Sequence, residues 1–163
     1  MGKLFGTDGI RGKANIYPIT PELAMRLGKA IASAFGAAGK GSTRAIIGKD
    51  TRLSGYMLET ALTSGMISMC MDVYLVGPVP TPAVAHLTKS MIADVGLMIT
   101  ASHNPAEDNG IKIFDGFGFK LPDDVEAKIE NILLSDEEIK SDDPAKMGKA
   151  YRIDDSGGRY IEY

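Results

Sequence analysis

The sequence predicts an α/β fold, in which a mostly parallel but mixed sheet lies between layers of helices. Short apolar runs of strand length alternate along the chain with stretches of helical periodicity, as in parallel sheets covered on both faces. The runs at 95–99 and 111–114 follow each other too closely for a helical crossover, so we expect a mixed sheet. The chain has 163 residues, 44% hydrophobic and 24% charged, which suits a single globular domain.

Each helix is predicted from apolar residues on one face together with a signal at its start or end. Thr20 before Pro21 is typical of a helix N-terminus, and Gly36 and Gly39 end that helix. Ser54 is a candidate N-cap for the second helix. In chain order, the expected elements are a helix at 20–35, a strand at 45–47, a helix at 54–69, a strand at 72–76, a short helix at 82–86, strands at 95–99 and 111–114, and a helix at 122–134.

Composition limits the kinds of partner. A net charge of -3 gives no reason to expect a nucleic-acid surface or a membrane-attracted face. No apolar stretch is long enough to span a bilayer, and the N-terminus lacks the apolar core of a signal peptide. The single cysteine, Cys70, has no partner for a disulfide, and its apolar surroundings favour a buried side chain. We therefore expect a cytoplasmic protein.

The most informative motif is Thr-Ala-Ser-His-Asn-Pro at 100–105, directly after the apolar run at 95–99. The Asn-Pro pair breaks the chain, so Ser102 lies in a tight turn at a strand's carboxyl end, where open α/β sheets bind their ligands. A hydroxyl placed there beside His103 is a candidate nucleophile that carries a group covalently. A turn or a helix cap is the alternative explanation for these residue types.

Three further loops carry small and charged residues at the ends of apolar segments. The first, at 5–12, combines three glycines with an aspartate and Arg11, which suits phosphate binding but matches no standard nucleotide-binding spacing. In the second, at 48–55, Lys49 and Arg52 could face an anion, but a surface ion pair between Asp50 and Arg52 is the more ordinary explanation. In the third, at 108–112, Lys112 points away from its neighbours Ile111 and Ile113, either to solvent or toward Ser102.

These loops suit a phosphoryl group on Ser102. Phosphoserine carries nearly two negative charges at neutral pH, and Arg11, His103 and Lys112 are the cations in plausible reach. Phosphoryl transfer depends on positioning and charge stabilisation, usually with a divalent metal. No cluster of carboxylates at metal-ligand spacing stands out after a core strand, so protein ligands for a metal are not expected in this chain.

Together the loops resemble the α-D-phosphohexomutase superfamily, and within it the bacterial phosphoglucosamine mutases. Five ordered motifs carry the resemblance, which covers nearly the whole chain: Lys-Leu-Phe-Gly-Thr-Asp-Gly-Ile-Arg-Gly at 3–12, Gly-Lys-Asp-Thr-Arg at 48–52, the Ser102 motif, Asp-Asn-Gly-Ile-Lys at 108–112 and Gly-Phe-Lys-Leu at 118–121. The resemblance implies a four-domain enzyme of which this chain matches the first domain. We expect residues 1–150 to form that domain and residues 151–163, which stop inside a helical pattern, to begin the connection to a missing second domain.

The resemblance also implies a function. Such enzymes interconvert glucosamine 6-phosphate and glucosamine 1-phosphate through a sugar bisphosphate, for cell-wall precursor synthesis. Ser102 would carry the phosphoryl group, and an oxygen of that group would bind Mg²⁺. Arg11 and Lys112 would stabilise the moving group and assist proton transfer, with His103 as a neighbouring helper. A homodimer is also implied, and we expect the chain alone to lack useful turnover because it matches one domain of four.

Three alternatives stay open at this point. The chain could be a non-catalytic module that binds sugar phosphates or a protein partner. It could be a serine hydrolase, although no Gly-x-Ser-x-Gly elbow surrounds Ser102 and adjacent residues such as Ser102 and His103 rarely act as nucleophile and base. It could also belong to a sibling mutase that acts on glucose or mannose phosphates.

Overall fold

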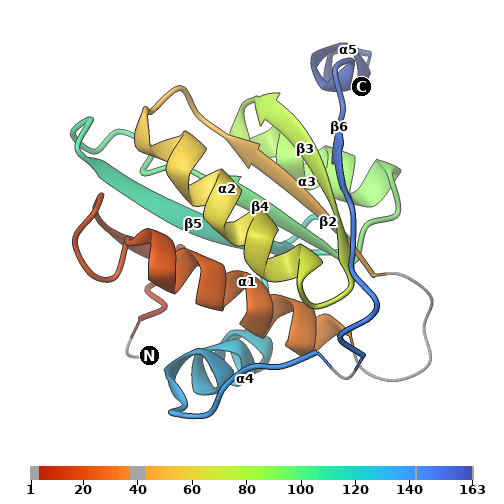
Figure 1. The fold of residues 1–163 in the computed structure, drawn as a ribbon. Helices are drawn as coiled ribbons and strands as arrows, with labels where there is room; N and C mark the ends of the chain where they lie inside the picture. The colour runs from red at the N-terminus through yellow and green to blue at the C-terminus, as the bar shows by residue number, and fades with distance from the viewer. Residues whose placement is uncertain (1–3, 37–42, 142, 163) are drawn as a thin grey trace.

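The computed structural model describes residues 4–36, 43–141 and 143–162. Lys3, Gly39 and Tyr163, which the sequence predictions used, lie outside these ranges. The described elements are β1 (Ile10–Lys13), α1 (Pro21–Phe35), β2 (Thr43–Lys49), α2 (Ser54–Ile67), β3 (Met71–Pro78), α3 (Thr81–Ser90), β4 (Val95–Ile99), β5 (Asp108–Asp115), α4 (Asp123–Leu134), β6 (Ala150–Arg152) and α5 (Ser156–Ile161). Figure 1 shows them in chain order from red to blue.

The strands form one mixed, mostly parallel sheet in the order β1-β5-β4-β2-β3-β6. β2 is parallel to both β4 and β3, and β3 is parallel to β6. β5 runs antiparallel to β4 on one side and to β1 on the other. The prediction of a mixed α/β sheet is therefore confirmed, and the short connection between β4 and β5 explains why that pair is antiparallel.

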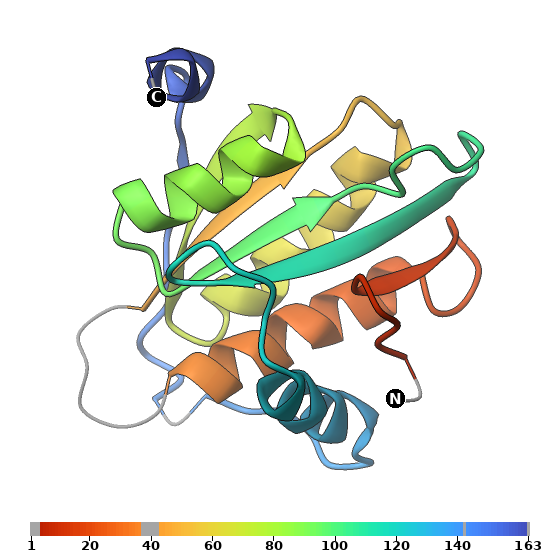
Figure 2. The same cartoon turned by 180° about the vertical axis from the view of Figure 1, so that it is seen from behind.

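Helices cover both faces of the sheet. α1 and α2 lie on one face, with α4 beside α1 (Figure 1), and α3 lies on the other face (Figure 2). The larger apolar core lies under α1, α2 and α4, and includes Leu27, Ile47 and Leu97. A smaller core lies under α3, around Ile46, Leu87 and Met98. Burial of both strand faces explains the nearly continuous apolar sequence of β2 and β4.

Two strands were not predicted. The opening at 5–12 was interpreted as a loop, but Ile10–Lys13 forms β1 because it pairs with β5 in a register that joins Arg11 to Gly110. Likewise Ala150–Arg152 forms β6, whose Tyr151 ring stacks on that of Tyr74 in β3 with centroids 5.0 Å apart. Both are short edge strands without clear alternation, so a neighbouring strand decides their conformation.

Helix starts agree only in part with the predictions. Thr20 caps α1 by accepting a hydrogen bond from the Leu23 N–H at 3.3 Å. Ser54 does not cap α2: Leu53 occupies the cap position without a side-chain hydrogen bond, and Ser54 lies in the first turn. Cys70 is not buried in an apolar helix. It lies in the turn after α2, partly exposed, and its thiol donates to the carbonyl of Lys146.

Among the described residues, no helix has both the length and the apolar character needed to cross a membrane.

Candidate functional site

The candidate site is built at the carboxyl ends of β2 and β4, which are adjacent and parallel. The register pairs Lys49 with Ile99, so the segments that follow these residues leave the sheet side by side. Lys49 is not available to a bound anion, because its ammonium group is already paired inside the protein. It is buried, and its Nζ lies 2.6 Å from Glu59 Oε2 of α2. It therefore ties β2 to α2 beneath the loops.

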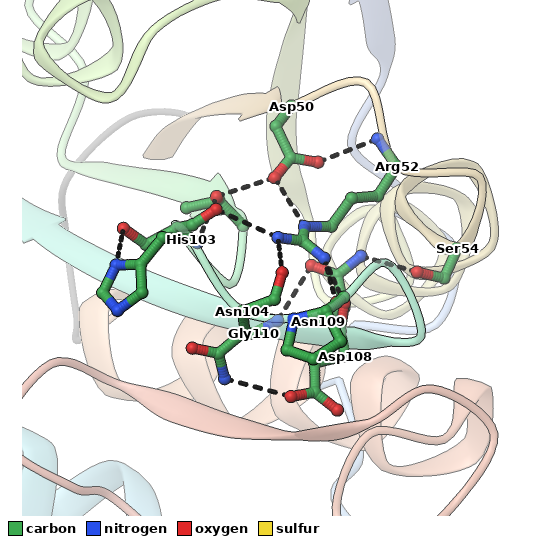
Figure 3. A network of polar contacts seen from close by, with 11 residues as sticks. Asp50, Arg52, Ser54, His103, Asn104, Asp108, Asn109 and Gly110 are labelled. Carbon is green, nitrogen blue, oxygen red and sulfur yellow. Dashed lines mark hydrogen bonds and ion pairs between the residues drawn. The ribbon is translucent and has the colours of Figure 1, made fainter.

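Arg52 joins the two loops. Its guanidinium donates hydrogen bonds to backbone carbonyls of the Ser102 loop, residues 100–108, at both ends of the turn (Figure 3). The accepting oxygens are those of Ser102 at 3.0 Å, Asn104 at 2.9 Å, Pro105 at 2.5 Å and Asp108 at 3.1 Å. The Nε of Arg52 lies 3.0 Å from Asp50 Oδ2. The predicted Asp50–Arg52 pair is therefore present, but it is not a solvated surface pair, because the Arg52 side chain is only 11% exposed.

A second chain of hydrogen bonds runs from Asp50 to the backbone of Ser102. Asp50 Oδ2 accepts from the Thr100 hydroxyl at 2.7 Å, and Thr100 Oγ1 in turn accepts from the Ser102 N–H at 3.0 Å. Ser102 adopts a left-handed conformation with φ of 57°, which non-glycine residues seldom adopt. Its side chain is exposed, while the preceding Ala101 is buried. The loop thus presents the Ser102 hydroxyl to solvent from a braced backbone.

The remainder of the loop is also internally bonded. Asn104 Nδ2 donates to Asp108 Oδ2 at 3.0 Å, which closes the turn across the Asn-Pro break. Asn109 is fully buried and donates to the hydroxyl of Ser54 at 2.8 Å, so the first turn of α2 supports the start of β5. The first contact is local, whereas the second joins residues that are 55 positions apart in the sequence.

His103 lies beside the serine, as predicted. Its Nδ1 is 3.4 Å from the Ser102 Oγ, which is long for a hydrogen bond from a hydroxyl group. Both side chains are exposed. The imidazole therefore lies beside the hydroxyl, and no third group among the described contacts fixes it there.

Arg11 and Lys112 meet at one carboxylate. Arg11 Nη2 lies 2.7 Å and Lys112 Nζ 2.8 Å from the same oxygen, Asp8 Oδ2. The hydrogen bond from Lys112 lowers the pKa of the Asp8 carboxyl below its ordinary value, and the charges of both cations act in the same direction. Ile111 and Ile113 are buried on the opposite face, which confirms the predicted orientation of Lys112 away from them.

The sheet register connects this charged group to the Ser102 loop. Arg11 pairs with Gly110, and the Gly110 carbonyl accepts from the N–H of Thr100 at 2.9 Å. Lys112 lies two residues further along β5, opposite Met98. Because side chains alternate between faces, Arg11 and Lys112 project from the same face of the sheet. The structure therefore brings Ser102 to His103 and brings Arg11 to Lys112, and the hydrogen bond between Thr100 and Gly110 joins the segments that carry the two pairs.

Two residues in this site were missed or undervalued by the sequence predictions. Arg52 was interpreted as half of an ion pair, and nothing in its local sequence indicates the carbonyls of a loop fifty residues later. Asp8 was noted only as one aspartate in a glycine-rich opening. The sequence offers one indication of its ion pair with Arg11, because the two residues are three positions apart. Nothing in the sequence indicates its second partner, Lys112, which β5 places beside it.

The candidate site lacks a ready-made group of metal ligands among the described residues. None of them form a group of three or more histidine, cysteine, aspartate or glutamate side chains that could bind a metal ion. The carboxylates nearest the loop already have partners: Asp50 accepts from Arg52 and Thr100, and Asp108 accepts from Asn104. The residues present here therefore do not supply a protein cage for Mg²⁺.

Comparison with known proteins identifies the family. Residues 2–140 match the model of the phosphoglucomutase/phosphomannomutase family, alpha/beta/alpha domain I. The chain belongs to this family. It is 62% identical over 161 residues to a phosphoglucosamine mutase of Cereibacter sphaeroides, and 58% identical over 165 residues to one of Pelobacter propionicus. These alignments cover 99% and 100% of this chain but only 36% of each relative.

Solved structures of this family have the same fold. A putative phosphomannomutase from Thermus thermophilus superposes with a TM-score of 0.80 at 29% identity, over 97% of this chain and 34% of that one. A phosphoglucomutase/phosphomannomutase family protein from Burkholderia thailandensis gives a TM-score of 0.78 at 27% identity, over 98% of this chain and 34% of that one. The chain thus spans about a third of the length of its relatives.

Proposed function

We propose that this chain is the phosphoserine-bearing part of a phosphoglucosamine mutase, which interconverts glucosamine 6-phosphate and glucosamine 1-phosphate through a sugar bisphosphate. The observation that carries the proposal is the conformation of Ser102. Its hydroxyl is exposed at the carboxyl end of β4, on a left-handed residue braced by Arg52 and Thr100. A braced, exposed hydroxyl suits a nucleophile that receives a phosphoryl group and gives it up again.

Each nearby group then has a role in this proposal. Arg11 and Lys112 supply positive charge from the sheet face that adjoins the loop, where a phosphoryl group in transfer needs it. Lys112 and His103 are the groups able to move a proton near the Ser102 hydroxyl. When bound through an oxygen of phosphoserine, Mg²⁺ neutralises phosphate charge, and its carboxylate ligands would come from outside the described residues.

The glucosamine substrate is proposed from the relatives named phosphoglucosamine mutase, which are about 60% identical along the whole chain. A sibling mutase acting on glucose or mannose phosphates shares the fold at below 30% identity. This contrast in similarity favours the glucosamine enzyme. A cytoplasmic location and a homodimer belong to the same proposal, and both rest on the resemblance.

Two covalent probes test the proposal against its alternatives. The chain is incubated with Mg²⁺ and glucosamine 1,6-bisphosphate, or separately with a fluorophosphonate, and the labelled residue is mapped by peptide mass spectrometry. We expect the bisphosphate to phosphorylate Ser102 and the fluorophosphonate to leave it unlabelled. Labelling by the fluorophosphonate alone would indicate a serine hydrolase instead. No labelling by either would indicate a module that binds without catalysis.

A further inference from the structure

The charged group on the β1–β5 face contains an anion supplied by the chain itself. Asp8 Oδ2 lies 2.7 Å from Arg11 Nη2 and 2.8 Å from Lys112 Nζ, so one oxygen accepts from both cations. No other acid forms a salt bridge to either cation among the described residues. Both cations are the ones expected to meet a phosphoryl group. Asp8 therefore occupies the position that an incoming anion needs.

The Asp8 contact leaves the two cations incompletely satisfied. The Nε of Arg11 is buried and has no hydrogen-bond partner among the described residues. A planar guanidinium can donate two parallel hydrogen bonds to a phosphate, which offers three equivalent oxygens. The single oxygen of Asp8 that both cations share accepts only one hydrogen bond from the guanidinium of Arg11. A phosphate dianion also carries more charge than the carboxylate, so it can replace Asp8 on both cations.

Asp8 is placed so that it can leave. Its side chain is 55% exposed, whereas those of Arg11 and Lys112 are 32% and 18% exposed. It lies in a tight turn that the Gly6 N–H closes onto the Gly9 carbonyl at 2.9 Å, while Arg11 and Lys112 project from paired strands. Rotation of the exposed Asp8 side chain breaks both contacts, while Arg11 and Lys112 stay anchored on paired strands.

We propose that Asp8 is an internal counter-ion that neutralises Arg11 and Lys112 in the empty site and competes with the phosphate dianion that replaces it. This inference rests on the phosphate-handling part of the proposed function. It assigns Asp8 a regulating effect on affinity and no part in the bonds made or broken. The dianion can arrive on a sugar phosphate or as the phosphoryl group of Ser102, since both present the same chemistry.

The test is a titration of the chain with inorganic phosphate, followed by NMR chemical shifts of the backbone amides. Asp8→Asn removes the charge and keeps the shape. The matched control is Asp155→Asn, which removes the same charge from another exposed aspartate, whose Oδ2 lies 2.9 Å from Arg159 Nε at the other end of the chain. We expect Asp8→Asn to lower the Kd for phosphate by about three- to tenfold, and the control to change it by less than about twofold.

Weaker or unchanged phosphate binding in Asp8→Asn would overturn the proposal, because it would make Asp8 a positioning group or a bystander. An equal effect in Asp155→Asn would also overturn it, because net charge would then explain the change. Since the titration does not require Ser102 to be phosphorylated, a failure here is distinct from a failure of the carrier proposal.

A chain with phosphoserine installed at position 102 separates the two sources of phosphate. If the protein-borne group displaces Asp8, this chain will bind inorganic phosphate less tightly and lose its sensitivity to Asp8→Asn. If the sugar-borne group displaces it, tighter binding in Asp8→Asn will persist.

Discussion

A guanidinium group can donate five hydrogen bonds in one plane, and Arg52 uses this geometry to gather the Ser102 loop. Four carbonyls and one carboxylate accept from it. These bonds leave Arg52 no free donor to offer a phosphate, so the proposed function assigns charge stabilisation to Arg11 and Lys112. The sequence predicted the nearby Asp50 contact because it is local. It could not predict the carbonyl contacts, which depend on the β2–β4 pairing that brings the loops together.

Arg52→Lys should loosen this loop without removing the charge. A lysine ammonium group cannot reach four carbonyls, so we expect the free energy of unfolding to fall by about 2–4 kcal/mol. The amides of Asn104 and Asp108, which are bonded within the turn, should exchange faster with deuterium. Arg44→Lys is the control, since Arg44 has an exposed side chain on β2. Unchanged exchange in Arg52→Lys would contradict the proposed bracing.

Glu126 should make stability depend on pH. Burial raises the pKa of its carboxyl, and this effect outweighs the opposing charge of Lys120. Because the pKa of Glu126 is raised in the folded state, the free energy of unfolding increases as pH falls from the folded-state pKa to the ordinary value of 4.5. Below that value the carboxyl is protonated in both states, and this contribution no longer changes. Glu126→Gln should therefore raise the Tm at pH 7, with the gain shrinking in acid.

Thermal unfolding of Glu126→Gln between pH 3 and 8 checks this expectation. Glu138→Gln serves as the control because Glu138 is an exposed acid that forms an ion pair with the exposed Lys140. A gain in Tm that is independent of pH would show that the carboxyl charge is not its cause.

Sequence patterns predicted the helices and strands whose own residues form a clear apolar face. The four strands β2, β3, β4 and β5 and the helices α1 to α4 have apolar faces that the sequence displays. By contrast, β1 contains Gly12 between two charged residues, and β6 has three residues with two exposed. These strands form because β5 and β3 offer unpaired edges, which only the assembled sheet provides.

The close packing of α1 on α2 gives a prediction at this scale. A Cβ at Gly65 would lie 2.1 Å from the carbonyl oxygen of Met25, and one at Gly28 would lie 2.5 Å from that of Leu62. Since both obstacles are backbone atoms, Gly65→Ala should destabilise the fold by about 2–4 kcal/mol, as judged by chemical denaturation.

Gly158→Ala in α5 is the matched substitution, because a Cβ there meets nothing within 4 Å. Alanine favours a helix over glycine, so this change should be neutral or slightly stabilising. Similar losses in both variants would show that helix contact is not the reason for glycine at Gly65.

For the whole molecule, the arrangement of layers decides where the site can lie. α1, α2 and α4 cover one face, while α3 covers the β2–β4 side of the other (Figure 2). Arg11 and Lys112 project from this second face at β1 and β5, beside the Ser102 loop.

The chain spans about a third of the length of its relatives, so we expect it to show no measurable interconversion of the glucosamine phosphates in a coupled assay. A rate near that of a full-length relative would contradict this expectation.

The most direct test of the account is to count and locate the phosphoryl groups on the chain after incubation with glucosamine 1,6-bisphosphate and Mg²⁺. Intact mass gives the number per chain, and phosphopeptide mapping gives the residue. We predict one phosphoryl group, on Ser102, that is absent from Ser102→Ala. A chain in which Ser102 stays unmodified, or in which Ser102→Ala is phosphorylated equally, would contradict the account.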